Sequence, residues 1–233
     1  MKFIPLAILL FFFTAHSANA QSSSSDNAWT QEELNNANTA KDVPYLSNEE
    51  KEIVFYMNIA RTDGTRFFNT YFQDFVNSYN VDMQKYSNYD ELKVNRKDKY
   101  YRGLEQDLRN INRLPLFSPD ETLTFVAQQH AKDLSRHNIA GHNSSDGRTV
   151  KDRISKYYPR RAMAENLAFG FSTGLANVCM LLLDKGVPDL GHRKTILGTG
   201  YNLSRVGVNI MTHPGYRYCA VIDFISGPAP AAR

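Results

Sequence analysis

Two capping boxes constrain the fold of this chain most strongly, because each one marks where a helix begins. In residues 47–50 (SNEE), the serine hydroxyl can accept from the backbone N–H of Glu50, whose carboxylate reaches back to the serine N–H. Residues 118–121 (SPDE) repeat the pattern, with proline at the first helical position. The sequence therefore predicts one helix from Ser47 to about Arg61 and a second helix that starts at Ser118.

The second of these helices carries an apolar stripe at helical spacing. The stripe consists of Leu123, Val126, Ala127, Ala131 and Leu134. His130 lies on the same stripe, so we expect a hydrogen-bonded core histidine there rather than a ligand-binding one.

Other segments of the chain predict further helices and a strand pair. Aromatic residues recur at helical spacing over 67–75, and the nearly continuous apolar run 175–183 predicts a buried helix. Residues 205–211 alternate and are rich in β-branched side chains, which predicts a strand. Residues 216–225 predict its antiparallel partner, joined to it by a His-Pro-Gly turn.

The two ends of the chain predict an exported protein with flexible flanks. Residues 1–20 contain an early lysine, a short apolar run and the triplet Ala18-Asn19-Ala20, which predicts a signal peptide cleaved after Ala20 and a secreted or periplasmic location. We expect a flexible leader over 21–46, one domain over 47–226 and a flexible tail over 227–233. Within the domain, the charged and tyrosine-rich segment 76–102 has little periodicity, which predicts an insertion or a long loop. The apolar run is too short to span a bilayer, so no transmembrane segment is expected in the mature chain.

Charge and cysteine content exclude several classes of function. Lys and Arg total 27 against 24 Asp and Glu, with no dense basic run, so we expect no nucleic-acid partner. Cys179 and Cys219 are the only cysteines, which leaves either one disulfide between them or two buried thiols. No CxxC motif is present, which argues against thiol redox chemistry and cysteine zinc sites.

Residues 170–174 (GFSTG) match the G-x-S-x-G nucleophile elbow of α/β-hydrolases. The required chain order of serine, acid and histidine is met by Ser172, Asp184 and His192. However, that fold places several strand–helix units before its elbow, whereas this chain predicts capped helices there. A glycine-flanked surface loop is therefore the preferred interpretation.

A second candidate constellation consists of His142, Glu165 and His192, each of which lies beside a turn signal or in a loop-like context. Two imidazoles and one carboxylate suit a divalent metal with an open coordination position. They suit a metal-free acid/base pair equally well, because a partly buried glutamate beside histidine is poised to shift its pKa. The long spacing does not itself show that the three side chains meet.

Five short motifs occur in order along the chain: 130–133 (HAKD), 141–143 (GHN), 164–168 (AENLA), 191–197 (GHRKTIL) and 206–208 (VGV). This ordered set resembles the CAP superfamily, which comprises cysteine-rich secretory proteins, antigen 5 and plant pathogenesis-related 1 proteins. The similarity is to the bacterial extracellular, SCP-like branch and covers roughly residues 47–225.

The resemblance implies an α+β fold, a three-layer α-β-α sandwich with a small, mainly antiparallel sheet. It also implies that His142, Glu165 and His192 converge in a central cavity that can hold a divalent metal, most often zinc. This chain departs from animal and plant members in lacking a second glutamate between Glu165 and His192. Asp184 and Asn166 are the candidates for orienting the three groups.

Three functions follow from these residues. The first, which we favour, is an exported binding module whose His/Glu cavity holds a divalent metal and a small-molecule, peptide or cell-envelope ligand. The second is a hydrolase in which metal-bound or His/Glu-activated water attacks a peptide, ester or cell-wall substrate. The third is an envelope interaction protein that uses the tyrosine-rich region 79–101 as its contact surface.

Overall fold

A four-stranded mixed sheet forms the centre of the computed structural model, which describes residues 27–198 and 202–227. The strands are β1 (Ser118–Pro119), β2 (Met163–Phe169), β3 (Leu203–His213) and β4 (Arg217–Ser226), in the order β1-β3-β4-β2. Only β1 runs parallel to its neighbour, so the predicted mainly antiparallel sheet is confirmed. The predicted signal peptide, its cleavage site, the first residues of the leader and most of the tail lie outside the described residues.

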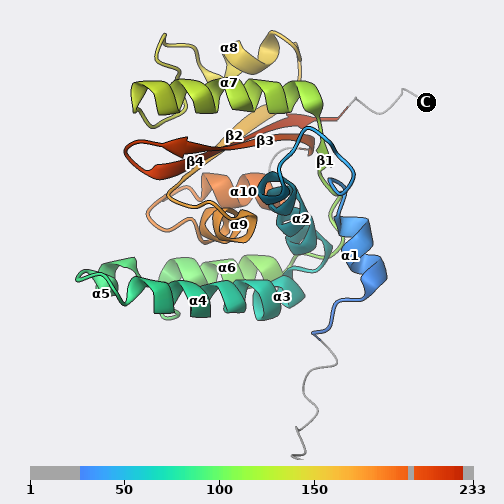
Figure 1. The fold of residues 1–233 in the computed structure, drawn as a ribbon. Helices are drawn as coiled ribbons and strands as arrows, with labels where there is room; N and C mark the ends of the chain where they lie inside the picture. Colours follow the sequence, from blue (N-terminus) through green and yellow to red (C-terminus); the bar gives the residue numbers. More distant parts are fainter. Residues whose placement is uncertain (1–26, 199–201, 228–233) are drawn as a thin grey trace, which may run out of the picture.

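Helices cover both faces of the sheet, as Figure 1 shows. One face packs on α7 (Glu121–His137), beside which lies α8 (Val150–Ser155). The other face carries α2 (Asn48–Thr62), α9 (Gly174–Leu183) and α10 (Gly191–Leu197). The fold is therefore the predicted α+β, three-layer α-β-α sandwich. None of the described helices is long and apolar enough to cross a membrane.

A further helical layer lies beyond α9 and α2, farthest from the sheet (Figure 1). Its elements are α3 (Gly64–Phe67), the π-helical turn η1 (Phe68–Phe72), α4 (Gln73–Met83), α5 (Tyr89–Leu92) and α6 (Lys99–Arg109). The predicted aromatic helical segment over 67–75 is thus present, and it sends Phe67 and Phe72 into the core. Residues 76–102 are largely helical, so the long-loop alternative was wrong, whereas the insertion stays a prediction. Periodicity is weak there because α4 buries only its first residues, Phe75 and Val76.

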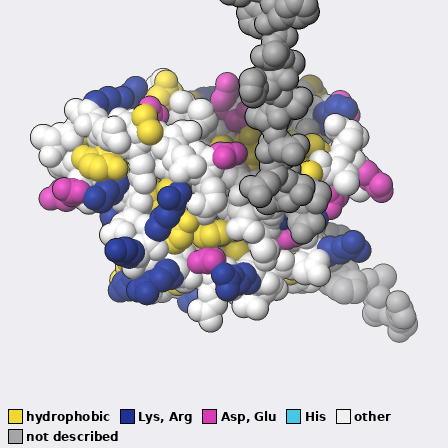
Figure 2. All heavy atoms as spheres, turned by 90° about the horizontal axis from the view of Figure 1, so that it is seen from below, with side chains coloured by type: hydrophobic (Ala, Val, Ile, Leu, Met, Phe, Trp, Pro, Cys, Tyr) yellow, Lys and Arg dark blue, Asp and Glu magenta, His cyan; other side chains and the backbone are white. Residues whose placement is uncertain are grey.

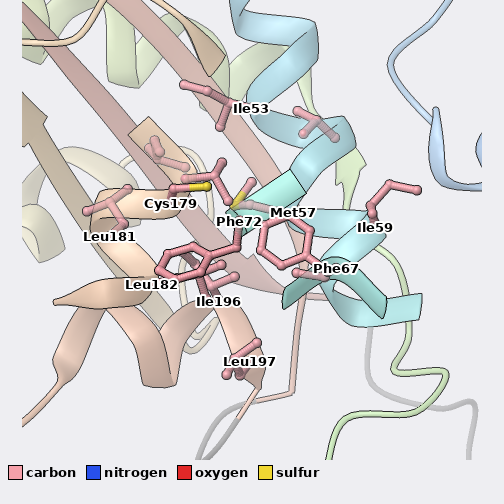
Figure 3. Packing of buried hydrophobic residues seen from close by; sticks show 14 of the residues in the cluster. Ile53, Met57, Ile59, Phe67, Phe72, Cys179, Leu181, Leu182, Ile196 and Leu197 are labelled. Carbon is pink, nitrogen blue, oxygen red and sulfur yellow. The ribbon is translucent and has the colours of Figure 1, made fainter. Parts of the chain in front are cut away.

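The largest core lies between α2, α9 and this outer layer (Figure 3). Met57 from α2, Phe72 from η1 and Leu182 from α9 are all fully buried. Burial of each such side chain contributes about 1.5–3 kcal/mol. This packing holds α9 and α10 against the sheet, and those two helices carry one half of the candidate site.

The two predicted capping boxes have different outcomes. Ser47 caps α2 with the reciprocal Glu50 contact, as predicted. The prediction at Ser118 was wrong, because the N-cap of α7 is Asp120. Ser118 and Pro119 instead pair with β3, and the backbone N–H of Asp120 donates to Val206 O at 2.8 Å.

The described part of the leader is ordered, which corrects the prediction of a flexible segment. The helix α1 (Gln31–Ala37) begins with a capping box at Thr30. Trp29 donates from Nε1 to Thr70 Oγ1 at 3.2 Å, and the Arg66 guanidinium lies 4.6 Å from its ring centroid. Ala37 is fully buried against the domain. One aromatic anchor and one apolar helix face therefore stabilise a segment of otherwise polar composition.

Both cysteines are free, so the candidate disulfide was wrong. Cys179 on α9 belongs to the large core, whereas Cys219 on β4 packs with residues of α7 on the opposite face of the sheet. Burial raises the pKa of the Cys179 thiol and raises that of Cys219 to about 11. Both residues therefore act as small buried hydrophobes.

Candidate functional site

The edge strand β2 positions the candidate site, because successive side chains on a strand point to opposite faces. Glu165 points towards the α7–α8 layer, where it contacts Arg153 of α8. Asn166 points towards α10, where its amide donates to the backbone carbonyl of His192 at 3.2 Å. Two neighbouring residues of β2 therefore connect groups on the two faces of the sheet.

Glu165 is the centre of the first half of the site. Its Oε1 lies 2.8 Å from His142 Nδ1, and its Oε2 accepts from an Arg153 guanidinium nitrogen at 2.5 Å. The same guanidinium donates to the carbonyls of His142 and Arg148 and to Ser144 Oγ. Arg153 therefore holds the loop that carries His142 as well as the carboxylate that His142 contacts.

The charge state of Glu165 follows from opposing effects. Burial favours its neutral form, but the hydrogen bond to His142 and the charge of Arg153 outweigh burial and lower its pKa. Glu165 is thus a buried carboxylate that contacts the Arg153 guanidinium through one oxygen and the His142 imidazole through the other. The His142 side chain is 52% exposed, so it is the part of this cluster that meets solvent.

Asp223 lies directly opposite Glu165 in the register between β2 and β4. It is fully buried, and neither of its carboxylate oxygens has a hydrogen-bond partner among the described residues. Burial, and then the negative charge of Glu165, raise its pKa well above its ordinary value. The neutral form of Asp223 avoids placing a second buried negative charge beside the ionised Glu165.

Sequence reasoning missed both Asp223 and Arg153. An acid inside the apolar run 219–225 was a usable signal, because such a residue is rarely fully buried without a role. Nothing in the sequence around Arg153 distinguishes it from an exposed helix cation.

His130 is the core histidine that its position on the α7 stripe predicted. Its side chain is fully buried, with Nε2 3.1 Å from the Gly141 carbonyl and Nδ1 3.4 Å from Ser144 Oγ. Burial lowers its pKa. His130 therefore supports the loop that precedes His142 and keeps both ring nitrogens occupied.

His192 forms the second half of the site, at the start of α10. Asp184 Oδ1 lies 2.7 Å from His192 Nδ1, while Asp184 Oδ2 accepts the backbone N–H groups of His192 and Arg193. The N-cap residue of α10, Leu190, has a left-handed φ of 54° and makes no side-chain cap. Asp184 thus caps α10 and contacts the imidazole, in the orienting position for which the sequence made it a candidate.

The predicted three-ligand metal site does not fit this geometry. The structure pairs His142 with Glu165 and His192 with Asp184, so among the described residues no single carboxylate contacts both imidazoles. Across residues 27–198 and 202–227, no three His, Cys, Asp or Glu side chains are arranged to hold a metal ion. Both oxygens of Glu165 already bond to His142 and Arg153, and a guanidinium next to a metal would repel it. The two Nε2 atoms alone are fewer than the three protein ligands usual for catalytic zinc.

The G-x-S-x-G segment does not form a catalytic triad. Ser172 precedes the first turn of α9, whereas Asp184 and His192 lie beyond its last turn. A helix of this length separates them by about 15 Å. Ser172 instead lines a surface groove of about 430 Å³ between α4 and the β2–α9 loop. A smaller pocket of about 70 Å³ between α7 and α8 reaches His130 and Arg153.

Comparison with known proteins identifies the family. Residues 103–224, more than half of the chain, match the family described as "CAP: Cysteine-rich secretory protein family". The chain belongs to the CAP family. A comparison with the curated proteins finds no match.

Two solved structures are similar to this CAP protein. One is an extracellular protein containing a SCP domain from Bacillus anthracis, with 28% identity over 49% of this chain and a TM-score of 0.40. The match spans 35% of the length of that protein's chain. The other is an outer surface protein from Borrelia burgdorferi, with 23% identity, coverage of 57% of this chain and 96% of that chain, and a TM-score of 0.42.

Proposed function

We propose that this CAP protein is an exported binding module that receives its ligand at the imidazole Nε2 atoms of His142 and His192. Export rests on the signal-peptide pattern of residues 1–20. The observation that carries the proposal is the paired environment of the two histidines. Each has Nδ1 within 2.8 Å of a carboxylate oxygen, and in the described part of the chain neither Nε2 has a partner.

The chemistry of such a pair favours ligand binding. When Nδ1–H donates to a carboxylate, the neutral ring presents a lone pair at Nε2, and the ring orientation is fixed. A hydroxyl, amide or ammonium group of a ligand can then donate to Nε2. A small-molecule, peptide or cell-envelope ligand with such donors meets this requirement. The proposal needs no metal, because the ligand donates directly to Nε2. Glu165, which would have to bind a metal, is already bonded to Arg153.

Imidazole nitrogen NMR tests the proposal directly. The chain would be titrated with soluble peptidoglycan fragments and short peptides while the ring nitrogens of His142 and His192 are observed. We expect Nε2 of these two residues to shift, whereas His213, whose Nε2 contacts the Ile139 carbonyl, stays unchanged and serves as the internal control. If no probe shifts either residue, or if His142→Ala binds as well as wild type, the proposal fails. A separate titration with zinc alone shows whether the two imidazoles take a metal.

A hydrolase is the second candidate, because a carboxylate-oriented histidine is also the general-base part of a catalytic triad. His142 would accept a proton from water at Nε2, while Glu165 stabilises the resulting imidazolium. Wild type would be compared with Glu165→Gln for turnover of casein, esters and cell-wall fragments. Hydrolysis predicts turnover that Glu165→Gln abolishes in a protein with unchanged circular dichroism. Absence of turnover by wild type leaves binding as the function.

A further inference from the structure

The outer helical layer carries a concentration of basic side chains that the site does not use. They are Lys85, Arg96, Lys97, Lys99 and Arg102, which we call the basic face, and all five are exposed. Figure 2 views this layer directly and shows Lys and Arg side chains gathered on the left, the side on which α5 lies in Figure 1. All five precede residue 103, where the family match begins, so membership of the CAP family does not account for them.

The charges of the basic face are not neutralised within the protein. Among the residues that the structure places, none of the five forms an ion pair with a carboxylate. Arg96 donates only to the neutral side chains of Gln73 and Asn77, at 3.2 and 2.8 Å. Lys85 and Lys99 instead lie 5.3 and 5.0 Å from the ring centroids of Tyr86 and Tyr100.

Carboxylates close to the basic face cancel only part of its charge. Asp98 is the N-cap of α6 and accepts the backbone N–H of Tyr100. Asp90 pairs with Lys93, which is not one of the five. Asp82 and Glu91 are exposed nearby in the sequence, and they leave an excess of positive charge.

An exposed apolar side chain lies next to these cations. Val81 is 64% exposed, and Tyr86 is 42% exposed. Val81 is four residues after Asn77 on α4, so the two share one helix face, and Asn77 is the residue that Arg96 contacts. The surface therefore combines uncompensated cations, tyrosine rings and an aliphatic side chain.

We propose that the basic face docks this protein on the surface of an anionic lipid bilayer. Lys and Arg side chains attract anionic headgroups, while amphipathic tyrosines lie at the headgroup level. Val81 would lie at the boundary of the acyl region, which a water-soluble polyanion does not offer. No described helix can cross a membrane, so this contact is peripheral.

The test is co-sedimentation of the chain with phosphatidylcholine vesicles that do or do not contain phosphatidylglycerol, at low and high salt. The test variant is Lys97→Gln/Lys99→Gln/Arg102→Gln. Its matched control, Lys132→Gln/Arg136→Gln/Lys151→Gln, removes the same charge from the α7–α8 layer on the other side of the sheet. Vesicles without phosphatidylglycerol control for binding through the apolar run near the N-terminus.

We expect wild type to bind only the anionic vesicles and to dissociate at high salt. The basic-face variant should bind about 100-fold more weakly, while the matched control keeps the wild-type affinity. Val81→Ser should weaken binding about tenfold. Equal losses in both triple variants, or equal binding to both kinds of vesicle, would overturn the proposal. Full binding by Val81→Ser together with equally tight binding of polyphosphate would assign the face to a soluble polyanion instead.

Discussion

Replacing Asp223 with asparagine should stabilise the protein at neutral pH, although the change removes a carboxyl group from the core. The side chain is fully buried opposite Glu165, with no hydrogen-bond partner in the described structure for either oxygen. Asparagine has nearly the same shape, cannot ionise, and offers an N–H group that Glu165 can accept. The substitution therefore removes a buried ionisable group without opening a cavity.

The sign and size of the effect follow from the raised pKa of Asp223. Its ordinary value is 3.8, and burial followed by the Glu165 charge raises it well above that in the folded protein. The folded protein then keeps a proton that the unfolded chain releases, so stability falls as pH rises from 3.8 to the folded pKa. Each pH unit within this window costs about 1.4 kcal/mol. The advantage of Asp223→Asn should grow with pH at that rate and then level off.

Urea denaturation followed by circular dichroism at a series of pH values measures this difference. Glu165, whose pKa is lowered, contributes the opposite slope in both proteins, so the difference between them reports Asp223 together with its interaction with Glu165. Asp146→Asn is the control, because the Asp146 side chain is exposed and the hydrogen bond from the Arg148 backbone N–H lowers its pKa. Its effect should be small and of opposite sign. A gain from Asp223→Asn that is the same at every pH, or a loss of stability at neutral pH, would refute the reasoning.

Three further substitutions test other parts of the structure by the free energy of unfolding. Asp184→Ala should lower the free energy of unfolding by about 1–3 kcal/mol, because it removes the acceptor of one side-chain and two backbone N–H groups. It should also free the His192 ring, which would show new mobility by NMR. Gly207→Ala should cost more than about 3 kcal/mol, since the added Cβ would lie 2.2 Å from the Leu123 backbone carbon; full retention of the melting temperature would contradict that close approach. Arg153→Met should cost about 3–5 kcal/mol by leaving a buried carboxylate without its charged partner, and a wild-type denaturation midpoint would show that this pairing is not required.

Elements marked by a helical stripe, a long apolar run or a turn were predictable from the sequence, whereas the short strand β2 was not. The α7 stripe from Leu123 to Leu134 is buried as its spacing indicated, and so is the β3–β4 hairpin. The strand β2 gave no alternating pattern, because residues 165–168 are all buried. The strand that holds the site was therefore invisible to a search for alternation.

Local signals failed where long-range contacts decide the backbone. The SPDE pattern predicted a cap at Ser118, but the pairing of β1 with β3 keeps the backbone extended there, and the cap is Asp120. The leader contained a usable signal that was overlooked, since Thr30 and Glu33 form a capping box. For the candidate site, the sequence supplied His142, Glu165 and His192, while Arg153 and Asp223 depend on contacts across the fold.

The position of β2 in the sheet has a consequence for when the site is assembled. β3 and β4 are joined by a short turn, whereas β2 pairs with residues of β4 that lie at least 50 positions further along the chain. Closing the longer loop loses more chain entropy, so we expect the hairpin to form early and β2 to join it late. Nascent or partly folded chains would then lack the contact between His142 and Glu165. The ligand recognition proposed above for this edge would begin only once folding is complete.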